Sequence, residues 1–366
     1  MIRRVAFVLS QRTGGPVDLT VGLALALASR SGSREIRVIG PEPVTSAGQL
    51  NELWHPFELP SKYDARSAVR LRRLLHELAP DVVHAQDRRS GLVTAGLRGP
   101  VRVTTYHGVP EDVPAAWAAG RGGKRPSPRS SLVLSADALL AQSTHRVFAP
   151  SSSIANMLVR QLRVPADRVE VVPNGVTLPP PRGEIEAVKT LVCVGSLIPR
   201  KAFDLALRAF AVARRDHPQL RLRLVGDGPE RGSLEALSRQ LGIADYADFV
   251  GYREDVPEQL GKGEVFVLPS LNENQPLALL EAMGAGLACI ATTVGGTAEV
   301  MPEGHGVLVP PNNVEQLAAA IARLVGSPAT ASDMGSRAAR RARDLYSVSA
   351  CADAHLAAYS RLLANR

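Results

Sequence analysis

The stretch VFVLPSLNENQPLALLEAMGAGLACIATTVGGTAE, residues 265–299, decides the fold class of this chain. It opens with an apolar run, 265–268, whose length and composition are typical of a buried strand. A polar loop follows, and Pro276 lies where a first helical residue is favoured, because its missing N–H would have no partner there anyway. Residues 277–285 are predicted as this helix and 287–292 as the next strand. This strand, loop, helix and strand predict a parallel sheet, in which ligands bind at the carboxyl ends of strands.

Two acids in this stretch are candidate ligand-binding groups. Glu273 lies in the loop before the predicted helix, and Glu281 lies within the helix. A helix N-terminus suits a phosphate, and a carboxylate accepts hydrogen bonds from a vicinal diol. Diphosphate at the helix tip with a diol on either side describes a nucleotide sugar. Taken alone, two acids at this spacing are more often a solvated loop charge and a surface helix residue.

The wider motif resembles the E-x7-E signature of retaining GT-B glycosyltransferases, in particular the family-four group. The resemblance extends over nearly the whole chain, and it implies a GT-B fold and transfer of a sugar from a nucleotide donor. The pattern PS-x-x-E-x-x-P-x-x-x-x-E-A-M is matched by Pro269, Ser270, Glu273, Pro276, Glu281, Ala282 and Met283, and is continued by Gly295, Gly296 and Glu299.

Short apolar runs alternate with helical patterns along both halves of the chain, which predicts two Rossmann-like, doubly wound parallel sheets. The run PPPRG, 179–183, continues neither kind of element and is predicted as a linker. The predicted domains are 1–178, on the acceptor side, and 184–345, which binds the nucleotide sugar. By the resemblance, residues 346–366 form a terminal helix that returns to the first domain. The predicted strands are 5–10, 35–40, 54–59, 82–85, 101–106, 146–149, 169–172, 190–194, 220–225, 248–251, 265–268, 287–292 and 307–309.

The composition is that of a globular protein, with 45% hydrophobic and 21% charged residues among 366. Residues 1–180 contain 23 Lys or Arg against 14 Asp or Glu, whereas 181–366 contain 20 against 21. The excess positive charge therefore belongs to the first half. A scattered, Arg-rich surface without a partner explains it, and so does an anionic or membrane-borne acceptor. The basic cluster expected at an anionic membrane comprises Arg121, Lys124, Arg125 and Arg129; no nucleic-acid partner is expected.

No apolar run approaches the length of a membrane span, and the apolar segment near the N-terminus is predicted as a strand rather than a signal peptide. Cys193, Cys289 and Cys351 have neither metal nor redox spacing and are expected in the core, as in a reduced cytosol. The expected location is cytoplasmic, with peripheral contact at the inner face of the membrane left open.

In the first half, two loops after strands carry candidate residues. Gly14 and Gly15 follow the first strand, where a backbone without Cβ atoms can approach a ligand closely. His107 ends the run VRVTTYH at the carboxyl end of a strand, although a lone histidine is more often structural. The resemblance implies that His107 contacts the transferred sugar, that the glycines lie near the donor phosphates, and that His84 is a lesser candidate. It also implies that Asn174 and Gly175 form the interdomain hinge.

In the second half, VGSLIPRKAFD places cations where they would neutralise a departing diphosphate. The resemblance assigns this role to Lys201. Ser196 occupies the position where the family has an Arg, so Arg200 is the candidate substitute. Gly195 and Ser196 are expected to contact the donor.

The remaining expected donor contacts are implied by the resemblance alone, and no cofactor or metal is expected. The G-x-G at 226–228 lacks the third glycine of a dinucleotide fingerprint, which disfavours a dehydrogenase. The expected function is a retaining hexosyltransferase, of the bacterial glycan-synthesis type, that uses a UDP- or GDP-linked sugar and a glycan, lipid or small-molecule acceptor. A nucleotide-sugar 2-epimerase and a non-catalytic binding module are the alternatives. The additional donor contacts are Arg253, Asn274, Gln275, Pro276, Leu277 and Glu281.

Overall fold

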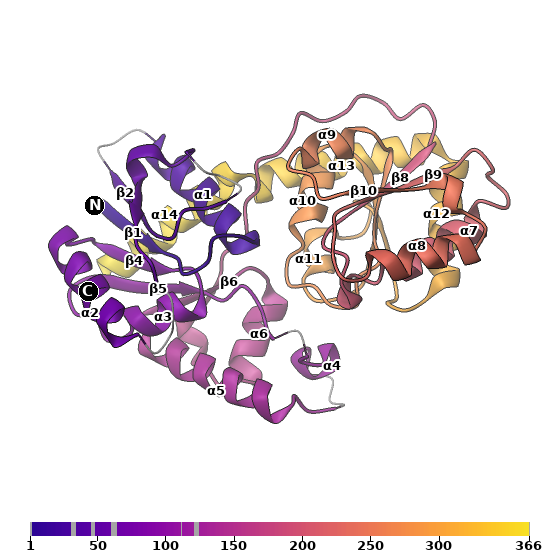
Figure 1. Cartoon of the computed structure of the whole chain (residues 1–366). Helices are drawn as coiled ribbons and strands as arrows, with labels where there is room; N and C mark the ends of the chain where they lie inside the picture. The colour runs from indigo at the N-terminus through magenta and orange to yellow at the C-terminus, as the bar shows by residue number, and fades with distance from the viewer. Residues whose placement is uncertain are drawn as a thin grey trace. The chain divides into compact units, whose positions relative to one another are not determined.

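The computed structural model describes residues 2–30, 34–44, 48–59, 64–110, 112–120 and 124–365. The chain divides into two compact units (Figure 1). Unit 1 comprises Met1–Val176 together with Tyr346–Arg366, and unit 2 comprises Thr177–Leu345. The proline-rich run 179–183 therefore lies within unit 2, where the Arg182 N–H donates a hydrogen bond to the carbonyl of Ala285.

The described residues of unit 1 form a seven-stranded parallel sheet in the order β3-β2-β1-β4-β5-β6-β7. Its strands are short and apolar, and their buried side chains form the core with the helices that cover the sheet. The strands are β1 (Arg4–Val8), β2 (Glu35–Gly40), β3 (Trp54–Pro56), β4 (Val82–Ala85), β5 (Val101–Thr105), β6 (Arg146–Ala149) and β7 (Val169–Val171).

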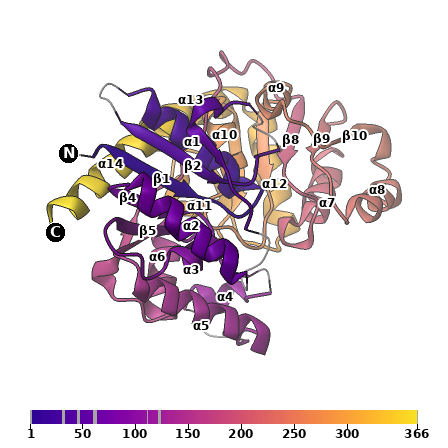
Figure 2. The same cartoon turned by 60° about the vertical axis from the view of Figure 1, so that its left-hand side comes forward.

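The helices of unit 1 include one from the end of the chain. This helix, α14, packs against α1 and contacts β5, and Figures 1 and 2 show it in yellow beside the indigo N-terminal elements. The helices are α1 (Gly15–Ala28), α2 (Ala65–Leu78), α3 (Arg88–Thr94), α4 (Ala115–Ala118), α5 (Pro128–Ser143), α6 (Ser152–Arg160), α14 (Val348–Ala364) and the short 3-10 turns η1 (Asn51–Leu53) and η2 (Ala166–Arg168).

The sheet of unit 2 is also parallel, and its order among the described residues is β10-β9-β8-β11-β12-β13. The central strands are buried on both faces, which explains why their sequences are continuous apolar runs. The strands are β8 (Thr190–Val194), β9 (Arg221–Val225), β10 (Ala247–Gly251), β11 (Val265–Leu268), β12 (Ala288–Thr292) and β13 (Val307–Val309).

Helices flank this second sheet. Among them, α7 packs against α12, and α10 lies between the two central strands β11 and β12 in the chain. They are α7 (Phe203–Ala213), α8 (Arg231–Gln240), α9 (Val256–Gly261), α10 (Leu277–Gly284), α11 (Thr297–Val300), α12 (Val314–Gly326), α13 (Pro328–Tyr346) and the 3-10 turns η3 (Pro199–Lys201) and η4 (Ala244–Tyr246).

The predicted fold class, two doubly wound parallel sheets with the terminal helix on the first, is confirmed. Helix α1 begins at Gly15, because Pro16 suits the first turn and Gly14 takes φ +102° as the cap. One helix start differs from its prediction. Pro276 is the cap of α10, not its first residue, and its carbonyl accepts from the N–H groups of Leu279 and Leu280.

The three cysteines are buried and unpaired, as predicted, and burial raises the pKa of each thiol. Within the described part of the chain, no helix is both long and apolar enough to cross a membrane.

Candidate active site

A buried carboxylate organises the loop that follows β11. The Glu273 side chain is 6% exposed, and its Oε1 lies 2.5 Å from the Lys201 ammonium nitrogen. The hydroxyl of Ser270 donates to the same oxygen at 2.8 Å. The second oxygen, Oε2, lies 3.7 Å from Nη1 of Arg200. The structure thus brings the predicted Arg200, Lys201 and Glu273 together around one carboxylate.

Both cations come from the 3-10 turn η3, which follows β8. Lys201 is buried, whereas the side chain of Arg200 is 38% exposed. Two further bonds tie the turn to the loop after β11. The Leu271 N–H donates to the Arg200 carbonyl at 2.8 Å, and Arg200 Nη1 donates to the Asn272 carbonyl at 3.4 Å. Two loops distant in sequence therefore form one cationic edge at the carboxyl end of the sheet.

Close backbone contacts require glycine at two positions near this edge. Gly295 has φ +51°, and a Cβ built there would lie 1.5 Å from the carbonyl oxygen of Glu273. Gly226 has φ +139°, and its Cβ would lie 2.0 Å from the carbonyl oxygen of Gly195. Neither position accepts a side chain without a backbone shift, because these contacts are shorter than van der Waals distances. The Gly295 contact fixes the loop that carries Glu273.

The other predicted donor residues of unit 2 surround the start of α10 and the loops after β8 and β10. The Asn274 carbonyl accepts from the Gly296 N–H, Gln275 is buried, and Leu277 is the first residue of α10. Glu281 lies in the second turn of that helix and is partly exposed. Ser196 follows Gly195 directly after β8. Arg253 stands apart from the Glu273 cluster in its contacts, because it forms a bidentate ion pair with Asp255 at 2.7 and 2.8 Å. These bonds lower the pKa of Asp255.

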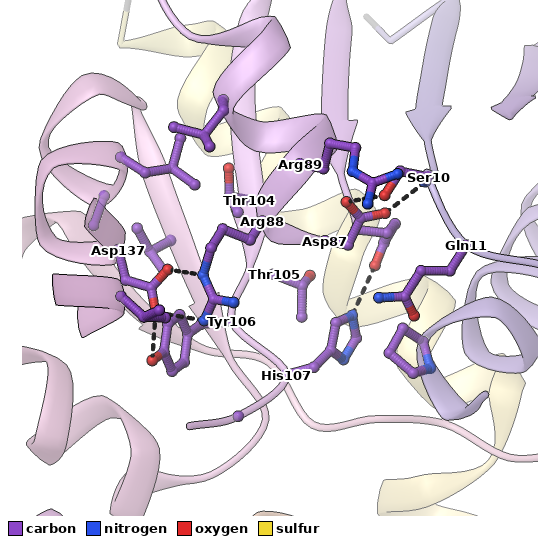
Figure 3. Close-up of a pocket in the computed structure, with 18 residues that line it drawn as sticks. Ser10, Gln11, Asp87, Arg88, Arg89, Thr104, Thr105, Tyr106, His107 and Asp137 are labelled. Atoms are coloured by element: carbon purple, nitrogen blue, oxygen red, sulfur yellow. Dashed lines mark hydrogen bonds and ion pairs between the residues drawn. The ribbon is translucent and has the colours of Figure 1, made fainter. Parts of the chain in front are cut away.

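Unit 1 contains a cavity of about 360 Å³ at the carboxyl ends of β1, β4 and β5 (Figure 3). Its polar lining includes His107 and Gln86, and its apolar lining comes largely from α5. Gly14 and Gly15 are not lining residues, although Ser10, Gln11 and Pro16 from the same loop are. The full lining is Ser10, Gln11, Pro16, Gln86, Asp87, Arg88, Arg89, Leu92, Thr104, Thr105, Tyr106, His107, Gly108, Val133, Asp137, Leu140, Ala141 and Val147.

His107 projects into this cavity, as its place after a strand predicts. Its Nε2 lies 3.1 Å from Oε1 of Gln86, which is buried at the end of β4 (Figure 3). Because the amide oxygen only accepts, this pairing places the proton on Nε2. Burial, with a smaller contribution from His355, lowers the pKa of His107 to about 4. The ring is therefore neutral near pH 7.

An ion pair between the buried Asp137 and the partly exposed Arg88 forms another part of the cavity lining and was missed by sequence reasoning. Asp137 of α5 accepts two hydrogen bonds from the Arg88 guanidinium, one of them at 2.8 Å, and a third from the Tyr106 hydroxyl at 3.0 Å. These bonds raise the pKa of Arg88, and burial raises that of Tyr106. The available signal was the position of Arg88 two residues after Gln86, directly beyond a strand. Its partner lies 49 residues further on, which no spacing rule finds.

His84, the lesser candidate, is not among the lining residues. Its side chain is fully buried, with Nδ1 2.6 Å from the Tyr359 hydroxyl of α14 and Nε2 2.7 Å from the Thr105 hydroxyl. Gly175 has a similar structural role, because a Cβ there would lie 2.3 Å from Cβ of Cys351 in α14. Both residues fasten the terminal helix to unit 1. Of the predicted basic cluster, Arg121 lies outside the described residues, and Lys124, Arg125 and Arg129 are exposed.

Among the described residues, no group of three or more His, Cys, Asp or Glu side chains is arranged to hold a metal ion.

Comparisons with known proteins match both units. Residues 14–178 match the family described as Glycosyltransferase Family 4, and residues 188–327 match Glycosyl transferases group 1. The D-inositol 3-phosphate glycosyltransferase of Geodermatophilus obscurus is 33% identical over 328 residues, 83% of this chain and 72% of that protein. An exopolysaccharide phosphotransferase of Streptomyces coelicolor is 34% identical over 80% of this chain, which spans only 30% of that relative's length.

The fold is shared with a solved structure. Anabaena HepE, crystallised with UDP and glucose, aligns with this chain at a TM-score of 0.81 and 18% identity. The alignment covers 98% of this chain and 100% of the HepE chain. This similarity supports the predicted GT-B fold class. The family matches of both units, together with the Geodermatophilus obscurus relative of which this chain covers 72%, show that the chain belongs to the group 1 glycosyltransferases.

Proposed function

We propose that this protein is a retaining hexosyltransferase that moves a sugar from a nucleotide donor to a hydroxyl acceptor. The observation that carries the proposal is the cluster of Arg200, Lys201 and Glu273 at the carboxyl end of the unit 2 sheet. Two cations beside one buried carboxylate suit a site that must hold both a diphosphate and sugar hydroxyls. UDP-glucose is the first donor to test, because the HepE structure contains UDP and glucose.

The cations would stabilise charge on the departing diphosphate. Glu273 holds Lys201 and Arg200 in place, 2.5 and 3.7 Å from its two oxygens, so the two cations are preorganised. Preorganised cations stabilise developing negative charge without a reorganisation cost during the reaction. We propose that Gly195 and Ser196, and Gly14 and Gly15 from unit 1, approach the phosphates through their backbones. The positive charge of Lys201 and Arg200 would make turnover independent of an added metal.

Carboxylates and polar groups near α10 would bind the hydroxyls of the donor. Glu273 would accept hydrogen bonds from the transferred sugar, and Glu281 from the ribose diol, since a carboxylate accepts from two hydroxyls. The segment 274–277 would border the sugar and phosphate, and Arg253 would border the base.

The transfer would proceed on one face of the sugar. No additional carboxylate is assigned as a covalent nucleophile, and the leaving phosphate would help to remove the proton of the acceptor hydroxyl. His107, neutral near pH 7, would form a hydrogen bond with a hydroxyl of the transferred sugar. The protein would thus contribute mainly position and electrostatics.

The acceptor would bind in unit 1, at the cavity beside His107.

The location of the protein would be cytoplasmic, with peripheral contact to an anionic membrane through α5. On this helix Leu132 and Leu139 are 74% and 69% exposed and lie seven residues apart, hence on one face. The exposed Lys124, Arg125 and Arg129 precede this face or lie at its start. Apolar side chains beside basic ones suit an anionic lipid surface.

A donor panel tests the proposal. UDP- and GDP-linked hexoses would be incubated with acceptor mixtures in EDTA, and the products would be analysed by NMR for anomeric configuration. We expect turnover of one donor class and an axial linkage from an axially linked donor. A product epimerised at C2 would indicate the epimerase instead. Tight nucleotide binding with neither transfer nor hydrolysis would indicate a non-catalytic module.

A further inference from the structure

The charged groups that line the cavity of unit 1 balance each other. The lining contains two carboxylates, Asp87 and Asp137, and two guanidinium groups, Arg88 and Arg89. His107 adds no charge near pH 7. Although unit 1 as a whole is rich in Arg, the cavity carries no net formal charge. The excess positive charge of unit 1 therefore lies outside the cavity lining.

Both carboxylates are occupied by groups of the protein itself. Asp137 is 3% exposed and accepts from Arg88 and Tyr106. Asp87 caps α3 and accepts from the Ser90 N–H at 2.9 Å, the Ser10 N–H at 2.6 Å and the Ser10 hydroxyl at 2.8 Å. Neither carboxylate therefore needs a cationic ligand. Because Asp137 contacts Arg88 directly, its negative charge offsets the attraction of that guanidinium for an anion.

Arg88 and Thr104 are among the polar groups that remain for a ligand. The Arg88 side chain is 40% exposed, and no described residue accepts a hydrogen bond from its Nη1. In Figure 3 this guanidinium lies between Asp137 and Tyr106 on one side and Thr105 and His107 on the other. The Thr104 hydroxyl is buried and has no partner within the described part of the chain. A buried hydroxyl without a partner is costly unless a ligand or water satisfies it.

The lining also has an apolar wall. Leu92, Val133, Leu140, Ala141 and Val147 contribute side chains, three of them from α5. A cavity with an apolar wall and a few convergent polar groups is typical of a small-molecule site. Sugar rings and their aglycones combine an apolar face with hydroxyl groups and so fit such a lining.

We propose that the cavity binds an uncharged, hydroxyl-bearing part of the acceptor and disfavours phosphate or carboxylate groups, with the Arg88–Asp137 pair setting this specificity. The proposal rests on the function proposed above, in which unit 1 binds the acceptor. An anion would be desolvated in a half-enclosed site whose two guanidinium groups are offset by two carboxylates, which is unfavourable. Arg88 donates to an acceptor hydroxyl while Asp137 keeps its charge balanced. This protein would therefore differ from its relatives named for D-inositol 3-phosphate.

Adding one positive charge to the cavity wall tests the proposal. Leu92 is 38% exposed and lines the cavity, so Leu92→Arg adds a cation while both members of the Arg88–Asp137 pair are kept. Leu92→Gln is the matched neutral control. Binding of glucose 6-phosphate and of octyl glucoside would be measured by shifts of the His107 and Tyr106 side-chain NMR signals. Both variants have the same unit 2, so any binding of glucose 6-phosphate there is equal in the two and does not affect their comparison.

We expect octyl glucoside to shift these signals in the wild type, and glucose 6-phosphate to bind Leu92→Arg at least about tenfold more tightly than Leu92→Gln. Asp137→Asn, if folded, should show the same gain, and Arg88→Ala in that background should remove it. A wild type that prefers glucose 6-phosphate to octyl glucoside would overturn the proposal, as would the absence of any shift by the neutral glycoside. These NMR shifts can be measured without a nucleotide-sugar donor. Failure of UDP binding and of transfer, with these shifts intact, would refute only the proposed function.

Discussion

Lys201 and Glu273 form the closest contact between the two loops of the unit 2 site. Substitution of Lys201 by Ala removes the nearer cation and leaves the buried carboxylate with Arg200 at 3.7 Å. If the ammonium stabilises the leaving diphosphate, turnover should fall by roughly 10²–10³-fold. Rates would be measured per folded molecule, with folding followed by circular dichroism. Lys189→Ala, at an exposed position in the same unit, is the control. A loss confined to folding would contradict the assignment.

His107 belongs to unit 1, whereas the residues proposed to hold the nucleotide belong to unit 2. His107→Ala should reduce transfer by at least about 10²-fold and leave the affinity for UDP nearly unchanged, since the lost hydrogen bond concerns the transferred sugar. Turnover would be compared with calorimetry on the bare nucleotide. His76→Ala, at an exposed position of α2, controls for the loss of an imidazole. Equal losses of turnover and UDP affinity would assign His107 to the fold or to the nucleotide site.

At the scale of elements, Gly295 fixes the loop that carries Glu273. Gly295→Ala places a methyl group on the Glu273 carbonyl and should lower the free energy of unfolding by about 2–4 kcal/mol, with weaker UDP binding. Gly242→Ala is a matched control, because Gly242 also has a positive φ, +70°, but has nothing within 4 Å of its Cβ position. It should cost only about 1 kcal/mol. Equal effects in urea denaturation would show that the close contact does not matter.

A buried cluster of rings joins α14 to the sheet of unit 1. His84 and His355 lie with Phe148 and Tyr359 at centroid distances of 5.3–6.0 Å. Burial lowers the pKa of His355 to about 4 and that of His84 well below its usual value. Since these rings are neutral when folded, the unfolded chain binds more protons once the pH falls below about 6.5. The stability they contribute is present above that pH and is lost as the pH falls toward 4.

This cluster predicts acid-sensitive unfolding of unit 1. Between pH 7 and pH 4.5, His355 alone should account for a loss of about 2–3 kcal/mol. His355→Gln should reduce this pH dependence, whereas His76→Gln should not alter it. Unfolding would be followed by tyrosine fluorescence and by amide exchange in each unit. If the His355 variant keeps the full pH dependence, the loss comes from other groups.

Buried helices and strands were predicted from the sequence more accurately than those at the edge of a sheet. The strand 265–268 and the helix after it were located almost to the residue, because a central parallel strand is apolar on both faces. The edge strand β3 is shorter than predicted, since only one of its sides is paired. Pairings between distant residues were not predictable. Lys201 and Glu273 were assigned to one site by the resemblance, but their direct contact, 72 residues apart, depends on the packing of two loops.

At the scale of the whole molecule, the exposed face of α5 predicts peripheral membrane binding. The protein should sediment with vesicles that contain phosphatidylglycerol, less with phosphatidylcholine alone, and less as salt increases. Replacing Leu132 and Leu139 by Ser should weaken binding at least about tenfold. Val212→Ser, on an exposed face of α7 in unit 2, is the control. Absence of binding to anionic vesicles at low salt would leave a soluble acceptor as the better hypothesis.

The pairing of Val176 with Ser347 has a consequence for biosynthesis. The two chain crossings between the units lie side by side here, through hydrogen bonds from Val176 N–H to the Tyr346 carbonyl and from Val348 N–H to the Val176 carbonyl. Unit 1 begins the chain, yet Tyr359 and other buried core residues of α14 emerge from the ribosome only after all of unit 2. Translation adds about 5–20 residues per second. Until α14 has been synthesised, the sheet of unit 1 has an uncovered apolar face, and unit 2 can fold first. A nascent chain stalled before α14 is therefore the form of this protein that a chaperone would be expected to hold.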